Sequence, residues 1–179
     1  MKRLMQMVPA VVLLILIGGF LFLDGPARPD APEQPIAYDH WLHVTKSDCK
    51  EGEEGCPQLE CTFCHENADK SSHATIPNVS KCMSCHQVIK TDSPEIQKLA
   101  AFSDRGEQPP WKRVYWIPSS ADVFFTHKPH IRANVDCVTC HGQIGQMHQV
   151  KREVNQDMGW CVACHRAQRV SVDCYVCHR

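Results

Sequence analysis

Cys161-Val162-Ala163-Cys164-His165 is one of five copies of a Cys-x-x-Cys-His pattern, and these copies decide the fold. Each copy places two thiols three positions apart, on one helical turn, with an imidazole directly after the second thiol. This pattern attaches haem c: the thiols bond to the porphyrin vinyl groups and the imidazole ligates the iron. The thiols belong to Cys61, Cys64, Cys82, Cys85, Cys137, Cys140, Cys161, Cys164, Cys174 and Cys177, and the proximal imidazoles to His65, His86, His141, His165 and His178.

Two other chemistries use closely spaced cysteines. A structural zinc site joins two such pairs around one ion, and it has no need for a histidine after every second cysteine. A redox dithiol needs one Cys-x-x-Cys rather than five. Since every copy ends in histidine, the sequence predicts five covalently attached haems.

Composition limits the architecture. The chain has 179 residues with 12 Cys and 11 His, and its formal net charge of −1 gives no indication of nucleic-acid binding. Beyond the apolar N-terminal run, about 31 residues remain per motif, fewer than the roughly 40 below which domains need cross-links or metals. We therefore expect the fold class to be a multihaem cytochrome c, mostly irregular with short α-helices packed around haems, plus one N-terminal transmembrane helix.

The N-terminus carries Lys2 and Arg3 ahead of an uncharged run, residues 4–23. Twenty residues at about 1.5 Å each span a hydrocarbon core of about 30 Å. We expect residues 1–25 to be a single-pass anchor in a bacterial cytoplasmic membrane, with the N-terminus in the cytoplasm and the rest on the periplasmic side. The alternative is a secretory signal cleaved near residues 25–27, which would release a soluble shuttle.

The exported part begins with a Pro-rich segment, residues 26–37, that we interpret as a stalk. Residues 38–179 then form the predicted periplasmic multihaem domain. Within it an aromatic-x-His-x-x-His pattern occurs twice, at residues 38–43 and 125–130. This weak repeat suggests two modules, about 38–90 and 124–179.

Each of the five irons has one further coordination position, on the distal face of its haem, and six histidines lie outside the motifs. We predict that the distal ligands are His40, His43, His73, His127 and His130, which would make every haem bis-histidine and low-spin. His148, Met147 and Met158 are the alternatives for one of these positions. The sequence leaves open which distal ligand belongs to which haem.

Two cysteines lie outside the motifs. Cys49 and Cys56 bracket an acidic loop, and in an oxidising compartment we expect them to form a disulfide. A single thioether bond from either one to a sixth haem is the alternative.

The order of motifs carries a resemblance to a known family. It runs from His40 and His43 through Ile76-Pro77 and Trp111-Lys112-Arg113-Val114 to residues 125–130, Cys140-His141-Gly142 and residues 158–166. This order resembles the multihaem cytochrome subunit of alternative complex III and of the menaquinone reductase (Qrc) complex of sulfate reducers.

The resemblance implies a function and partners. It implies an electron-transfer subunit of a membrane-bound quinone oxidoreductase complex, beside an iron–sulfur and molybdopterin-like subunit and integral quinone-binding subunits, with a periplasmic cytochrome c as partner. We favour electron flow toward menaquinone; the alternative is the quinol-oxidising alternative complex III. The competing enzyme class is a multihaem reductase in which one haem iron keeps a vacant coordination position for substrate. The candidate distal ligands are enough to make all five irons six-coordinate, and no side-chain catalytic site stands out.

Overall fold

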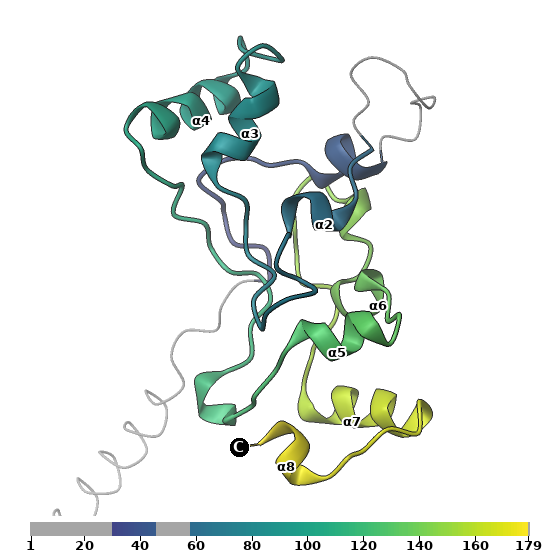
Figure 1. The fold of residues 1–179 in the computed structure, drawn as a ribbon. Coiled ribbons are helices and arrows are strands. Elements are labelled where there is room, and N and C mark those ends of the chain that lie inside the picture. The colour runs from purple at the N-terminus through teal and green to yellow at the C-terminus, as the bar shows by residue number, and fades with distance from the viewer. Residues whose placement is uncertain (1–29, 46–57, 179) are drawn as a thin grey trace, which may run out of the picture.

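Short helices joined by irregular segments make up the part of the chain that the structure describes (Figure 1). The computed structural model describes residues 30–45 and 58–178. No strand occurs in these ranges, where Val123 and His178 form an isolated antiparallel bridge. The helices are η1 (Trp41–Thr45), α2 (Cys61–Cys64), α3 (Val79–His86), α4 (Pro94–Asp104), η2 (Ser119–Ala121), α5 (His127–Arg132), α6 (Cys137–His141), η3 (Ile144–Gln146), α7 (Met158–Ala167) and α8 (Cys174–Cys177).

Five of these helices, α2, α3, α6, α7 and α8, contain the Cys-x-x-Cys segments. Helices of four to ten residues are marginal by themselves, so their ends need support. Asp136 accepts a hydrogen bond from the Val138 N–H (3.2 Å) at the start of α6, and Asp157 accepts one from Trp160 (2.8 Å) in α7. These caps fix the turns that present the third and fourth pairs of thiols.

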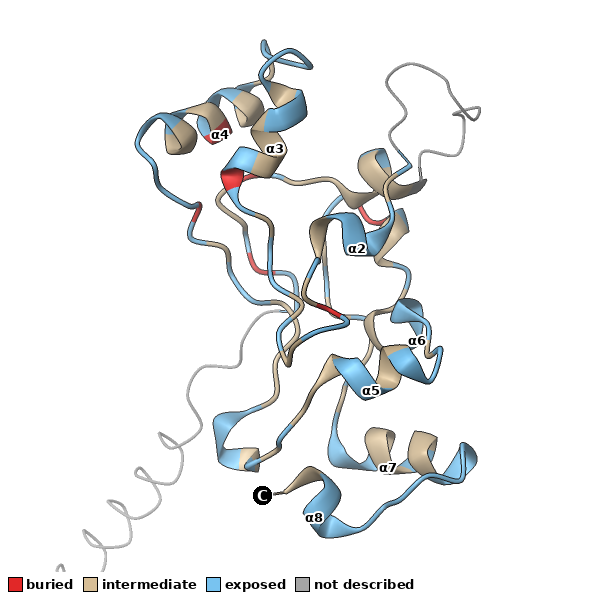
Figure 2. Ribbon diagram, viewed as in Figure 1, coloured by how far each residue is buried: buried red, intermediate tan, exposed pale blue. Residues whose placement is uncertain are grey.

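Few of the described residues are buried, and Figure 2 shows them as short, separate red segments. One cluster joins Ile36, Val79 and Leu99, and it lies between α3, α4 and the N-terminal segment. Ser93 and Pro94 begin α4, in the N-cap and first-turn positions that these residues favour. The packing of α4 on α3 is the conventional core of the described chain.

The segment 30–37 contacts the domain at three places. The Gln34 side chain donates to the Lys112 carbonyl (2.8 Å) and accepts from the Lys112 N–H (2.9 Å). The Arg152 guanidinium pairs with Asp30 at 2.6 Å. These contacts, together with the burial of Ile36, hold the segment on the domain; residues 26–29 lie outside the described ranges.

The prediction of a single-pass membrane protein needs correction. Among residues 30–45 and 58–178, no helix is long and apolar enough to cross a membrane. The longest described helix, α4, has 11 residues and includes charged side chains, whereas a span takes about 20 apolar ones. The segment on which the predicted anchor falls, residues 1–25, lies outside the described ranges.

Candidate haem sites

Three motif histidines face histidines from elsewhere in the chain. The ring centres of His43 and His86 are 6.0 Å apart, and those of His130 and His165 are 6.1 Å apart. The rings of His127 and His141 are 6.2 Å apart. Each pair joins a predicted proximal ligand to a predicted distal ligand.

This separation matches two ligands on opposite faces of one iron. Imidazole–metal bonds of about 2 Å, with about 1.1 Å from nitrogen to ring centre, place the two centres about 6.2 Å apart. Haem iron takes two ligands from the chain, whereas structural zinc takes four. In the part of the chain that the structure describes, no three His, Cys, Asp or Glu side chains gather around one point. The paired residues therefore suit haem iron.

Hydrogen bonds fix the orientation of most of these rings. In seven histidines the Nδ1–H donates to a backbone carbonyl oxygen at 2.5 to 3.2 Å. Such a bond leaves the Nε2 lone pair free for a metal and strengthens the imidazole as a ligand. The seven are His43, His65, His86, His127, His130, His165 and His178.

His40 lies near His65, the predicted proximal ligand of the first motif. Burial, and then the nearby charges of His65 and His43, lower the pKa of His40 to about 4. Burial and His127 likewise lower the pKa of His141 to about 4. Both imidazoles are neutral at pH 7, which is the form that binds a metal.

His73 is held in a local turn. Its backbone N–H donates to Ser71 Oγ (3.1 Å), and its Nδ1 lies 2.9 Å from Ser72 Oγ. The carbonyl of Ser72 accepts the Nδ1–H of His127. The loop that carries His73 therefore contacts α5, although no ring contact between His73 and a motif histidine occurs among the described residues.

The alternative ligands lie in other surroundings. His148 has a 69% exposed side chain and its Nδ1 is 2.7 Å from Asp39. Met147 is buried, and Met158 is exposed at the start of α7. None of these three contacts a motif histidine through a described ring contact or hydrogen bond. Cys49 and Cys56 lie outside the described residues.

Motif thiols show which sites are neighbours at one end of the molecule. Burial, and then the charge of Cys64, raise the pKa of Cys82, which places the second site beside the first. Burial, and then Cys137 through charge and a side-chain hydrogen bond, raise the pKa of Cys61. The first site therefore lies beside the third.

The same relation continues to the C-terminus. Burial, and then the charges of Cys164 and Cys161, raise the pKa of Cys140, so the third site neighbours the fourth. Burial, and then Cys177, raise the pKa of Cys161, so the fourth neighbours the fifth. The order in space is second, first, third, fourth, fifth, and Figure 1 shows α3 and α8 at opposite ends.

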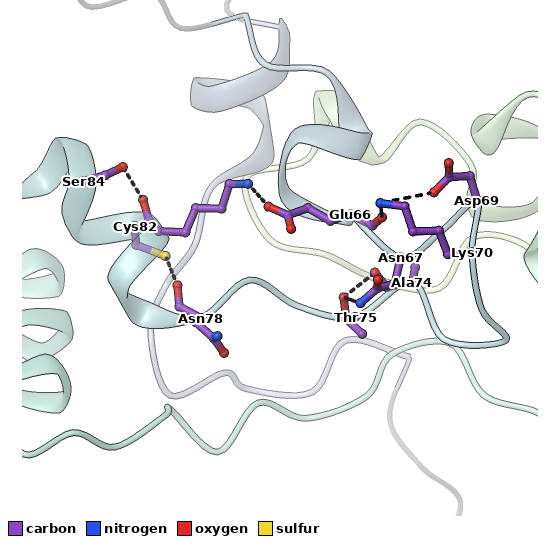
Figure 3. A network of polar contacts seen from close by, with 10 residues as sticks. Glu66, Asn67, Asp69, Lys70, Ala74, Thr75, Asn78, Cys82 and Ser84 are labelled. Carbon is purple, nitrogen blue, oxygen red and sulfur yellow. Dashed lines mark hydrogen bonds and ion pairs between the residues drawn. The ribbon is translucent and has the colours of Figure 1, made fainter.

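A cavity of about 410 Å³ opens beside Cys64, and Lys81 and Asn78 contribute to its lining. Figure 3 shows the polar network around it. Glu66 pairs with Lys81, and Asn67 donates to Thr75 Oγ1 at 3.2 Å. These contacts fold the loop that follows the first motif back onto α3.

The third motif is held by residues that the sequence did not single out as site residues. The Tyr115 hydroxyl donates to the His141 carbonyl (2.7 Å) and accepts from the Glu153 N–H (3.0 Å). Its ring meets the His141 ring edge-on, with centres 4.7 Å apart. Gln156 donates to the Cys140 carbonyl at 2.6 Å. The sequence signal for this clamp is the aromatic run of Trp111, Tyr115 and Trp116, whose spacing points to no particular haem motif.

Comparison with known proteins identifies no relative: no protein-family model matches the chain, and no curated protein matches it significantly.

Proposed function

We propose that the chain binds five c-type haems and acts as an electron-transfer protein. The observation that carries the proposal is the set of three His–His pairs at 6.0, 6.1 and 6.2 Å, each of which includes one motif histidine. The second, third and fourth sites then have the ligand pairs His43/His86, His127/His141 and His130/His165. The proximity of His40 to His65 supports that pair for the first site. His73 and His178 remain for the fifth.

Bound haem would supply one-electron Fe(III)/Fe(II) chemistry. The chain provides two imidazoles to each of the three paired sites and orients five of the six by hydrogen bonds to carbonyl groups. Two protein ligands leave no position for a substrate, so we infer electron transfer rather than substrate conversion. The small side-chain core is compatible with prosthetic groups at the centre of the fold.

The order of the sites supports transfer from one end to the other. The second and fifth sites are terminal, on α3 and α8. On the resemblance in motif order, we propose that a c-type cytochrome meets one end and that the quinone-reactive subunits of a menaquinone reductase complex, with its iron–sulfur and molybdopterin-like subunit, meet the other.

The test is a haem count on the full chain, produced with a haem-attachment system. Intact mass and the pyridine haemochrome spectrum should give five haems per chain, with a low-spin spectrum that carbon monoxide does not change. A reduced multihaem c-type cytochrome should then reduce all five. Fewer than five haems, or binding of carbon monoxide to the unaltered protein, would contradict the proposal.

A further inference from the structure

Tyr38 contacts both predicted distal ligands of the segment 38–43, here called the first distal unit. Its ring meets the His40 ring edge-on, with centres 4.7 Å apart and an angle of 86° between the planes. The same ring stacks on His43, with centres 4.6 Å apart and an angle of 24°. Both are favourable aromatic geometries.

Phe125 repeats this arrangement in the segment 125–130, the second distal unit. It meets His127 edge-on at 4.8 Å and 84°, and it stacks on His130 at 5.3 Å and 30°. The two units are unlike in backbone, since one leads into the π-helix η1 and the other forms the α-helix α5. The common ring geometry therefore belongs to the aromatic residue and the histidines.

A hydrogen bond recurs beside each stacked ring. His43 donates from Nδ1 to the Asp39 carbonyl at 2.7 Å, and His130 donates to the Thr126 carbonyl at 3.0 Å, in both cases four residues earlier. This bond fixes one atom of the imidazole. The face of the aromatic ring blocks the remaining rotation about the Cβ–Cγ bond, because a turned imidazole would collide with it.

We propose that Tyr38 and Phe125 are positioning residues: each ring fixes the planes of the two distal imidazoles in its unit and so sets the angle between each of these imidazoles and the motif histidine that it faces. The inference rests on the proposed haem ligation. The angles to the partner rings differ: 64° for His43/His86, 48° for His130/His165 and 19° for His127/His141.

The angle between ligand planes has a spectroscopic consequence. Nearly parallel imidazoles split the iron d orbitals unequally and give a rhombic low-spin electron paramagnetic resonance (EPR) signal. Steeply crossed imidazoles give a strongly anisotropic signal with a larger maximum g value. The oxidised protein should therefore show a rhombic signal from the third site and a more anisotropic one from the second.

Burial, and then the charges of Cys64 and Cys82, raise the pKa of Tyr38. The phenol is thus neutral and lies near thiols of both the first and the second site. Phe125 has no hydroxyl at the corresponding place, so the shared role needs only the ring.

The test compares EPR spectra of full-length, haem-loaded variants. Tyr38→Leu should shift the maximum g values of the first and second sites and leave the rhombic signal of the third unchanged. Phe125→Leu should shift the signals of the third and fourth sites and spare the second. Tyr38→Phe should match the unaltered protein, since the second distal unit already uses Phe.

The outcomes separate two failures. If the unaltered protein lacks five bis-histidine haems, the proposed function fails. If haems are bound and both leucine variants keep every g value, the positioning role fails. If Tyr38→Phe shifts the g values as much as Tyr38→Leu does, the effect belongs to the hydroxyl group and the inference is wrong. If one leucine variant loses haem, the other unit provides the test, and loss in both shows that the ring is required for attachment rather than for orientation.

Discussion

Replacing one distal ligand should change one haem in five. His127 is separate in sequence from every Cys-x-x-Cys segment, so His127→Ala leaves all the thioether bonds intact. Its ring is 6.2 Å from that of His141 and its Nδ1–H donates to the Ser72 carbonyl at 3.1 Å. We expect five attached haems, of which the third becomes five-coordinate and high-spin.

The size of the change follows from the ligand count. About one fifth of the low-spin absorbance should convert to high-spin, and about one carbon monoxide should bind per chain, because only His141 then ligates the third iron. Loss of the bond to Ser72 costs on the order of 0.5–1.5 kcal/mol, which is small beside a domain stability of about 5–15 kcal/mol. The fold should therefore persist.

The assay is an optical titration of the reduced variant with carbon monoxide, after a haem count. His148→Ala is the matched control, since His148 is exposed and its Nδ1 faces Asp39 rather than another ring nitrogen. An unchanged low-spin spectrum for His127→Ala would refute the ligation argument. Binding of carbon monoxide by His148→Ala but not by His127→Ala would show that the assignments of the two residues are reversed.

Three further substitutions test the supports of the fold. Leu99→Ala should destabilise the packing of α4 on α3 by about 2–5 kcal/mol, seen as a lower thermal midpoint, whereas exposed Val88→Ala should have little effect. Gly142→Ala should lower the folding stability by on the order of 1–3 kcal/mol or more, because Gly142 has a φ of +69° and a Cβ there would lie 2.8 Å from Glu153 Cβ. The measurement is the haem content of the third site, which should fall. Asp157→Ala should remove the cap on the Trp160 N–H and cost about 1 kcal/mol, whereas Asp157→Asn should retain most of the stability.

The features that the sequence predicts best depend on the spacing of residues close together in the chain. The Cys-x-x-Cys segments lie on helices because two thiols must share one turn, and the two aromatic-x-His-x-x-His segments bring three predicted distal ligands to motif histidines. Both patterns act over a few residues, where the backbone period determines which side chains share a face.

Other features depend on the path of the chain. The pairing of His43 with His86 rather than with the nearer His65 requires α3 to pack back toward η1, which no local spacing encodes. The helix α4 lies between the two predicted modules, in a stretch that has no haem motif. Its role follows from Leu99 meeting Val79, and Tyr115 likewise reaches His141 through tertiary structure alone.

The order of the sites bears on maturation of the protein. The thiols of Cys61 and Cys137 belong to different motifs yet lie within hydrogen-bonding reach. If the chain folds before haem is attached, an oxidant would join them, and one wrong disulfide would block two attachment sites at once. Synthesis from the N-terminus presents Cys61 long before Cys137, so haem attachment that keeps pace with chain emergence removes the first thiol before the second appears.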